Sequence, residues 1–436
     1  MKYKPVIGLE VHVELKTKSK MFCGCSADYF GQKPNTHTCP VCLGLPGALP
    51  VPNQKAIDWC VMIGHALNCK IANFSKFDRK NYFYPDLAKG YQISQYDQPF
   101  CQKGFMMLSN GKKLGITRVH MEEDTGKLTH QGDSSLIDFN RSGVPLVEIV
   151  TEPEFENAKE VTEYLKKLQQ IVRYLGVSKA DMEEGNMRLE PNISLRKEGE
   201  TSLPKYKVEV KNINSFRFVE KAIEFEIKRQ AEILDLGLVP VQETRGWNET
   251  KNKTISQRVK EEANDYRYFP EPDIPPVLLT DAEISKLKSE MPETPSAKFA
   301  RFKNEFALTD YDVKILTREN SLANYFEEAT KVGRKHNVNP KQIANHLINR
   351  NININSVLPA KLIEAIVKSN QTEQIDENKL NTIIGDVLKN NQKAVADYQA
   401  GKENAVMFLI GQVIRHAKQK LDTKIIKEKL EKKLIK

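Results

Sequence analysis

Three polar residues alternate with aliphatic residues close to the N-terminus. Within residues 8–15, Glu10, His12 and Glu14 alternate with leucine and valine. In a β-strand this alternation places two carboxylates and an imidazole on one face and the aliphatic side chains on the other. Carboxylates that gather on one strand face need a compensating charge, and a divalent cation with a phosphate commonly supplies it. The pattern therefore predicts an enzyme that handles Mg²⁺ and a nucleotide.

Two later segments show the same alternation of polar and aliphatic residues. The polar faces of segments 187–196 and 206–211 carry Arg188, Glu190, Asn192, Ser194 and Arg196, and then Lys207, Glu209 and Lys211. If the strands line one concave sheet, oxygen atoms can hold Mg²⁺ while lysine and arginine neutralise phosphates. The alternative is a solvated sheet face with scattered charge pairs. Each strand alone favours that alternative, whereas the three together with His12 favour a site.

A further acidic segment, HMEED, spans residues 120–124. Strict alternation places Glu122 on the same face as His120. The Thr-Gly that follows indicates that the strand is ending, so Glu123 or Asp124 could turn inward instead. The alternative is an ordinary acidic turn.

Four of the seven cysteines form two close pairs, CxC and then CxxC: Cys23, Cys25, Cys39 and Cys42. Two thiolate pairs across a polar, turn-rich loop match a closed tetrahedral zinc site, in which the metal supplies the order that the loop lacks. Because sulfur fills all four positions, such a zinc would be structural and not catalytic. The alternative is four reduced thiols in a loop.

Residues 77–86 interleave four aromatic residues with Arg79, Lys80 and Asn81. Such interleaving can stack bases and hold phosphate, but it is equally consistent with a packed turn that has a charged rim. The sequence contains no GxxxxGK[ST] and no GxGxxG, so a nucleotide site here is neither a P-loop nor a Rossmann site.

The length and composition set the class of protein. A chain of 436 residues is too long to fold around one ordinary hydrophobic core. A composition of 40% hydrophobic and 28% charged residues is typical of a soluble globular protein. The N-terminus has no signal-peptide core, which predicts a cytoplasmic location.

Residues 411–436 hold nine Lys/Arg and three Asp/Glu, a net charge of +6. This basic end favours a polyanionic partner such as RNA and a solvated helix face about equally.

The periodicity predicts an α+β protein. Strands are expected at 6–15, 115–121, 144–150, 187–196 and 206–210, and helices at 54–67, 158–175 and 216–236. Loops separate the strands widely, so a mixed or antiparallel sheet is expected. Prolines between 270 and 295 mark a boundary, after which only helices are predicted, at 322–336, 340–349, 361–369, 380–390 and within 395–436.

Several long motifs resemble those of one known family. GLEVHVEL, CPVCLGLPG, KFDRKNYFYPDL, ITRVHMEED, PLVEIVTEP, VKNINSF, DYRYFPEPD and VADYQAGKENAVMFLIGQV together span nearly the whole chain. They closely resemble the B subunits of aspartyl/glutamyl-tRNA(Asn/Gln) amidotransferases. The resemblance implies a cradle domain over residues 1–293 with a kinase-like site, a helical domain over 294–372, and a tail over 373–436 that binds tRNA.

The resemblance also implies an activity and its partners. With ATP and Mg²⁺, the cradle would phosphorylate the side-chain carboxylate of Glu or Asp misacylated onto tRNA(Gln) or tRNA(Asn). Ammonia would then replace the phosphate, arriving through a channel from a separate amidase (A) subunit, while a small third (C) subunit would brace the pair in a heterotrimer. Ammonia must be made elsewhere, since the chain has no evident Ser-Lys or Cys-His amidase apparatus.

The resemblance assigns roles to particular residues. Metal and phosphate positions carry over to Glu10, His12, Glu123, Glu190 and Glu209, of which all but Glu190 are also assigned catalytic roles. The family favours Glu123 over Glu122, against strict strand alternation. Asn212, Asn214 and Ser215 are expected to line the nucleotide site, and Lys80 to lie towards the channel.

The chain departs from the family pattern in two places. Glu190 stands where the family commonly has aspartate, in the motif RCDxN, so its carboxylate arm is one methylene longer. The region between about 350 and 375 looks shorter than in other members, which predicts a trimmed helical domain.

Two other functions stay open: a zinc-stabilised RNA-binding module without chemistry, and an ATP-dependent ligase for a free amino acid. The choice between Glu-tRNA and Asp-tRNA also stays open.

Overall fold

The structure is a computed structural model that describes residues 2–259, 266–350, 352–370, 376–417 and 421–434. By its internal contacts the chain divides into two units, Met1–Lys298 and Phe299–Lys436. Within the described residues, every strand belongs to the first unit and the second unit is helical. The predicted α+β class is confirmed.

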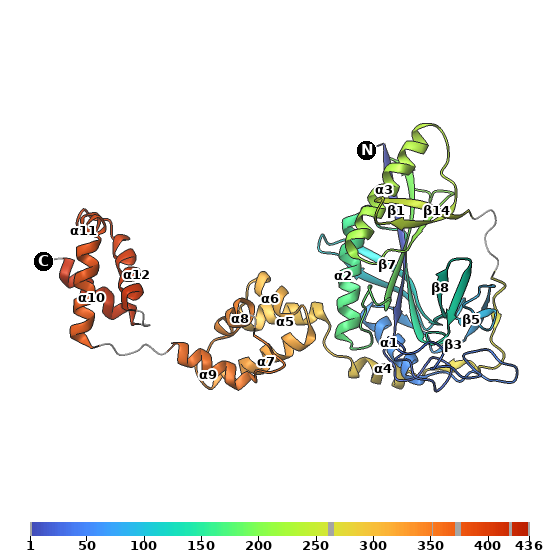
Figure 1. The fold of residues 1–436 in the computed structure, drawn as a ribbon, viewed down its shortest axis with the longest axis horizontal. Coiled ribbons are helices and arrows are strands. Elements are labelled where there is room, and N and C mark those ends of the chain that lie inside the picture. The colour runs from blue at the N-terminus through green and yellow to red at the C-terminus, as the bar shows by residue number, and fades with distance from the viewer. Residues whose placement is uncertain (1, 260–265, 351, 371–375, 418–420, 435–436) are drawn as a thin grey trace. The chain divides into compact units, whose positions relative to one another are not determined.

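A nine-stranded sheet forms the frame of the first unit (Figure 1). Its strand order is β14–β13–β12–β11–β1–β10–β7–β6–β2. Neighbouring strands are antiparallel except β12 and β13, which are parallel, so the sheet is mixed as predicted. The strands are β1 (Tyr3–Glu14), β2 (Lys70–Ile71), β6 (Cys101–Met107), β7 (Lys113–Glu123), β10 (Pro145–Thr151), β11 (Met187–Lys197), β12 (Val208–Lys211), β13 (Glu243–Asn248) and β14 (Lys253–Val259).

The apolar face of this sheet is covered by three helices, which Figure 1 shows along one side of it: α1 (Gln54–Ala66), α2 (Ala158–Tyr174) and α3 (Phe216–Asp235). Leu9, Val11 and Val13 of β1 belong to the same buried core as side chains of these helices. Asn157 and Ser215 cap α2 and α3 by accepting backbone N–H bonds, which fixes where each helix begins. Because β1 alternates strictly, covering its aliphatic face leaves its polar face to the opposite side of the sheet.

Small strand pairs join distant parts of the first unit. A three-stranded sheet contains β15 (Phe269–Pro270), β4 (Asp78–Asn81) and β5 (Tyr91–Ser94), and β16 (Val277–Leu278) pairs with β3 (Phe74–Ser75). The remaining pair is β8 (Lys127–Gln131) with β9 (Ser134–Asp138), and α4 (Asp281–Glu290) packs on α1. Arg79 of β4 donates to the fully buried Glu271 at 2.7 Å. This ion pair anchors the strand that carries Lys80.

The second unit consists of helices (Figure 1), whose buried side chains form two separate hydrophobic clusters. The first draws on α5 (Pro295–Phe306), α6 (Asp310–Leu316), α7 (Asn320–Arg334), α8 (Pro340–Asn349) and α9 (Pro359–Asn370). The second draws on α10 (Glu377–Asn390), α11 (Gln392–Gln399), α12 (Ala405–Ala417) and α13 (Thr423–Leu434). Each cluster has its own apolar core, so each is a candidate folding unit.

Most predicted elements are confirmed to within a few residues at their ends, including the five strands and three helices expected in the first unit. Strands β2 to β6, β8, β9 and β13 to β16 and helices α4 to α6 were not predicted. The domain limits at 293 and 372 stay predictions, and residue 372 lies outside the described residues. Among the described helices, none combines the length and the apolar character that a membrane-spanning helix requires.

Replacing Phe326 tests the first helical cluster. Phe326 is fully buried and packs against Phe302 and Phe306 with ring centroids 5.3 and 5.2 Å apart. Phe326→Ala should lower the free energy of unfolding of this cluster by about 3–5 kcal/mol, the usual cost of removing a buried aromatic ring. Thermal unfolding followed by circular dichroism would measure it. The control is Tyr311→Ala, since Tyr311 is 69% exposed, and equal losses for both variants would contradict the assigned core.

Candidate functional site

The polar face of β1 meets charged residues from both neighbouring strands. In the register of the sheet, Glu10 lies directly opposite Glu190 of β11, and His12 lies opposite Glu148 of β10. Like charges directly opposite each other on antiparallel strands repel. This face therefore needs cations, and the structure arranges its carboxylates in two clusters.

The first cluster contains His12, Glu122 and Glu148, whose ligand atoms all lie within 4.8 Å of one another. His12 Nε2 lies 3.9 Å from Glu122 and 3.7 Å from Glu148. Beside them, the buried His120 Nε2 lies 3.1 Å from Glu148, and Lys80 Nζ lies 3.3 Å from Glu122. The cluster is thus a group of carboxylates held between two imidazoles and an ammonium.

The charges of this cluster sustain one another. Burial alone would raise the pKa of Glu148, but the nearby His120 holds it at about 2. Burial opposes ionisation of Glu122 as well, and Lys80 is the main cause that keeps the pKa of Glu122 well below its usual value. Both carboxylates are therefore ionised at neutral pH, as a metal ligand must be.

The second cluster contains Glu10, Glu190 and Glu209, whose ligand atoms also lie within 4.8 Å of one another. Burial and then the charge of Glu148 raise the pKa of Glu10. Glu209 accepts a hydrogen bond from Thr244 Oγ1 at 2.7 Å, and Glu10 accepts one from Asn192 Nδ2 at 3.0 Å. Lys211 Nζ lies 3.0 Å from Glu190, so an ammonium is in direct contact with this cluster.

Both donor sets fit Mg²⁺. This ion prefers oxygen ligands and binds through a few carboxylates together with substrate phosphates. The second cluster offers carboxylate oxygens alone, and the first adds an imidazole whose Nδ1 is buried and has no hydrogen-bond partner among the described residues. His12 Nε2, which lies 3.9 and 3.7 Å from the two carboxylates, is the ring nitrogen that could bind the ion together with them.

Glu123 lies apart from both clusters. Its carboxylate accepts from Lys89 Nζ at 2.8 Å and from the backbone N–H of Ile93 at 2.9 Å. It borders a small cavity of about 110 Å³ that Cys23 and Cys42 also line. The alternation of β7 continues to its last residue, which turns Glu123 to the opposite face. Glu122 and not Glu123 lies beside His12, whereas the role that the family resemblance implies for Glu123 stays a prediction.

The residues expected to line a nucleotide site lie just beyond the second cluster. Asn212 follows β12 directly in a left-handed conformation with φ 61°, Asn214 is exposed, and Ser215 caps α3 through its bond from the Phe218 N–H. Lys80 lies in the first cluster on Glu122, with its ammonium 5.4 Å from the Tyr266 ring centroid. Their common role at a nucleotide site stays a prediction.

Sequence reasoning missed Glu148 and the role of His120. A signal for Glu148 was present, because it is the one charged residue in the aliphatic run 144–150. Its direction could not be known without the register that places it between His12 and His120. The roles of both residues depend on which strands become neighbours, and a single strand pattern does not contain that information.

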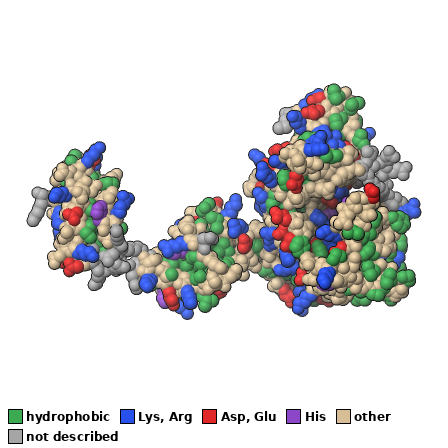
Figure 2. All heavy atoms as spheres, in the orientation of Figure 1, with side chains coloured by type: hydrophobic (Ala, Val, Ile, Leu, Met, Phe, Trp, Pro, Cys, Tyr) green, Lys and Arg blue, Asp and Glu red, His purple; other side chains and the backbone are tan. Residues whose placement is uncertain are grey.

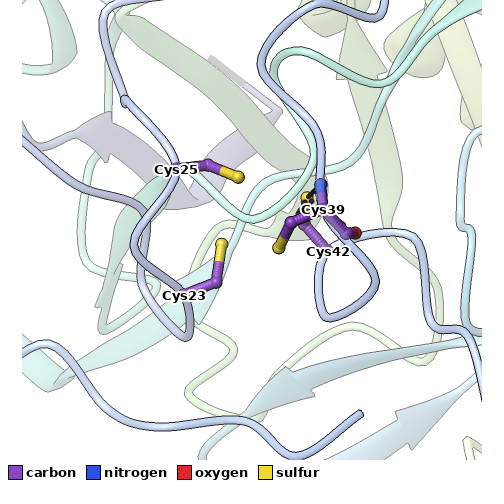
Figure 3. A group of neighbouring side chains, drawn as sticks. All are labelled: Cys23, Cys25, Cys39 and Cys42. Atoms are coloured by element: carbon purple, nitrogen blue, oxygen red, sulfur yellow. Dashed lines mark hydrogen bonds between the residues drawn. The ribbon is translucent and has the colours of Figure 1, made fainter.

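The four paired cysteines converge from two loop segments (Figure 3). Their sulfur atoms lie within 4.8 Å of one another, and all four are free thiols. A hydrogen bond from Cys23 lowers the pKa of Cys42 to about 4, with a further contribution from Lys20, whose ammonium lies 3.6 Å from the sulfur. The group matches the ligand set of a closed tetrahedral metal site.

Glu14, the third polar residue of β1, belongs to a separate buried network. It accepts from Tyr29, which lies in the loop between the cysteine pairs, and it shares a hydrogen bond with Asp124. Asp124 in turn accepts from Arg188 Nη2 at 2.6 Å. Burial, followed by the charge of Asp124, raises the pKa of Glu14 to about 8. Glu14 is therefore a neutral carboxyl beside an ionised one.

This pKa shift predicts a pH dependence of stability. Between about pH 4.5 and pH 8 the folded protein keeps the Glu14 proton that the unfolded chain loses, so Glu14 costs stability as the pH rises through this window. Glutamine does not titrate, and its amide can donate to Asp124 as the neutral carboxyl does. The melting temperature of Glu14→Gln relative to wild type should therefore rise between pH 5 and pH 8. A difference that stays constant across these pH values would contradict the assignment.

Comparison with known proteins gives two family matches along the chain. Residues 5–285 match the family model described as the GatB/GatE catalytic domain, and residues 340–434 match the one described as the GatB domain. The first match contains both carboxylate clusters and the four paired cysteines.

Full-length relatives cover the whole chain. The B subunit of the aspartyl/glutamyl-tRNA(Asn/Gln) amidotransferase from Thermoanaerobacter sp. (strain X514) is 46% identical over 481 aligned positions, covering 99% of this chain and 100% of the relative. Those from Thermodesulfovibrio yellowstonii and Thermotoga neapolitana are also 46% identical, covering 98% and 99% of this chain and 98% and 100% of the relatives. Since 481 positions exceed 436 residues, the first relative has segments that this chain lacks. The chain belongs to the family of aspartyl/glutamyl-tRNA(Asn/Gln) amidotransferase B subunits.

Proposed function

We propose that this chain is the subunit that activates the side-chain carboxylate of glutamate or aspartate misacylated on tRNA, using ATP. Its family membership makes it a component of a carbon–nitrogen ligase complex. The observation that carries the finer proposal is the pair of carboxylate clusters on one sheet face, each next to a lysine. Such a face suits a metal–polyphosphate substrate and is unnecessary in a protein that only binds RNA.

The chemistry explains why ATP is needed. A carboxylate is a poor acyl donor because its leaving group would be oxide. Transfer of the terminal phosphoryl group of ATP to a carboxylate oxygen gives ADP and an acyl phosphate. Ammonia then adds to the acyl carbon, phosphate leaves, and the amide of glutamine or asparagine remains on the tRNA. A site that excludes bulk water protects the acyl phosphate from hydrolysis in the interval.

Each of the two clusters would hold its own metal ion in this reaction. His12, Glu122 and Glu148 would hold one Mg²⁺, and Glu10, Glu190 and Glu209 a second. Bound Mg²⁺ spreads the charge that develops on phosphate oxygens. Lys80 and Lys211 lie at the clusters and add fixed positive charge. Asn212, Asn214 and Ser215 precede α3, whose N-terminal N–H groups favour an anion.

The proposed reaction requires two further subunits and a tRNA. The ammonia would come from an amidase (A) subunit, with a small (C) subunit in the same heterotrimer, and Lys80 would lie towards the incoming channel. A substrate carried on tRNA places the reaction in the cytoplasm.

Four lysines of α13 are exposed: Lys424, Lys427, Lys432 and Lys433. Figure 2 shows lysine and arginine side chains on the visible face of the C-terminal helices. These lysines would contact tRNA phosphates, which makes binding sensitive to salt.

Glu122 and Glu123 provide a matched test, because they are adjacent and both are buried. In the assembled complex, Glu122→Gln should reduce ATP hydrolysis that depends on Glu-tRNA or Asp-tRNA by at least about 100-fold, the scale of losing one charge-stabilising group. Glu123→Gln should lose much less, since its carboxylate contacts neither cluster. Circular dichroism would confirm that both variants fold. Loss of activity in Glu123→Gln with retention in Glu122→Gln would overturn the proposed cluster.

We also propose that the four paired cysteines bind a structural zinc ion. Metal analysis of the purified chain should find about one zinc per chain. Cys42→Ser should lose this zinc and lower the melting temperature. The control is Cys69→Ser, which lies outside the group and whose hydroxyl can donate to the Leu67 carbonyl that the thiol already contacts. Purified wild type without zinc and with unchanged stability would refute the proposal.

A further inference from the structure

The second carboxylate cluster already contains a cation, the ammonium of Lys211. Its Nζ lies 3.0 Å from Glu190 Oε2 and 3.7 Å from Glu209 Oε1. The third carboxylate, Glu10, is directly opposite Glu190 across the β1–β11 pair. Lys211 therefore forms ion pairs with two of the three carboxylates that a metal would need as ligands.

This arrangement follows from the register of the strands. Asn192 of β11 faces Glu209 of β12, so two residues further along the antiparallel pair Glu190 faces Lys211. Glu10, Glu190, Glu209 and Lys211 therefore share one side of three adjacent strands. The repulsion between Glu10 and Glu190 is relieved by an ammonium supplied from the next strand.

We propose that Lys211 is the resident cation of the Glu10–Glu190–Glu209 cluster and competes with the divalent metal for it. Metal entry breaks the contact between Lys211 and Glu190, and the displaced ammonium is then free to pair with a phosphate of the nucleotide. This inference rests on the proposed function, and it adds a means by which the protein links metal binding to nucleotide binding.

The length of the residue 190 side chain matters to this competition. The Glu190 carboxylate lies 3.0 Å from Lys211 Nζ, and an aspartate at this position would have one methylene less. A shorter arm on the same backbone position would withdraw the carboxylate from Nζ. The lysine–carboxylate contact in this chain therefore depends on the length of the residue 190 side chain.

The proposal has a thermodynamic consequence. Without nucleotide, the metal must displace an ammonium from its carboxylate partners, so binding of the metal alone is weakened. With nucleotide, the ammonium gains a phosphate, so nucleotide should strengthen metal binding and metal should strengthen nucleotide binding by the same factor. Removing the charge of Lys211 should tighten binding of the metal alone and reduce this mutual strengthening.

The experiment is a titration of the full chain with Mn²⁺, in which free Mn²⁺ is followed by electron paramagnetic resonance. Two classes of site are expected, and Glu10→Gln identifies the second class by removing it. Lys211→Met should tighten that class by about two- to fivefold, the scale of one partly exposed ion pair. In the presence of a non-hydrolysable ATP analogue, the increase in Mn²⁺ affinity should be smaller in Lys211→Met than in wild type.

Lys207→Met is the control for charge without contact, since the exposed Lys207 acts on Glu10 only through its charge, whereas Lys211 contacts Glu190 directly. It should change Mn²⁺ affinity less than Lys211→Met does. Glu190→Asp should shift the affinity in the same direction as Lys211→Met by a smaller factor. If Lys211→Met does not fold, Lys211→Gln and Glu190→Asp make the same comparison.

Two failures are distinguishable. If Lys211→Met leaves the Mn²⁺ affinity equal to that of Lys207→Met or weakens it, while tRNA-dependent ATP hydrolysis by wild type is intact, the competition is overturned and the proposed function is not. If Glu10→Gln leaves the number of bound Mn²⁺ ions unchanged, the second metal site itself is absent and the proposed function loses that cluster.

Discussion

The N-terminal unit is organised around buried and half-buried carboxylates whose charge needs positive partners. Five glutamates from β1, β7, β10, β11 and β12 lie on one face of one sheet: Glu10, Glu122, Glu148, Glu190 and Glu209. An ionised carboxylate away from water costs several kcal/mol unless a cation and hydrogen bonds compensate it. Lys80 and His120 serve the first cluster and Lys211 serves the second. The remaining negative charge is the reason why we propose that this face binds divalent cations.

The aliphatic face of the same strands makes this concentration of charge possible. Leu9, Val11 and Val13 alternate with the polar residues and join the core under α1, α2 and α3. A shift of one residue in the register would exchange the two faces, so the burial of the aliphatic face specifies where the charges go. The loop of the four cysteines is tied to this face as well, because Tyr29 donates to Glu14 on β1. A metal that orders the loop would also fix that contact.

Much of this arrangement could be predicted from periodicity, because the polar and aliphatic faces of β1, β11 and β12 are visible in the sequence. The pairing of the strands could not be predicted, because more than a hundred residues separate β1 from β10 and β11 in the sequence. That is why Glu148 and His120 were missed. For residues 122 and 123, strict alternation points to Glu122, which lies beside His12, whereas the family resemblance implies Glu123. The cysteine group was predicted in full because its spacing is local.

The two units of the chain differ in whether their titratable residues converge. In the helical unit the apolar residues recur at helical spacing and form closed cores, but no group of titratable residues with metal-ligand spacing converges there within the described residues. Chemistry is concentrated where strands from distant parts of the chain share a face.

The most direct measurement is the location of metal by anomalous scattering, in crystals of the protein grown with Mn²⁺ and a non-hydrolysable ATP analogue. We expect one peak among His12, Glu122 and Glu148 and a second among Glu10, Glu190 and Glu209, with the terminal phosphate near both. A peak at Glu123 and Lys89, or density for the nucleotide with no manganese at either cluster, would contradict the account.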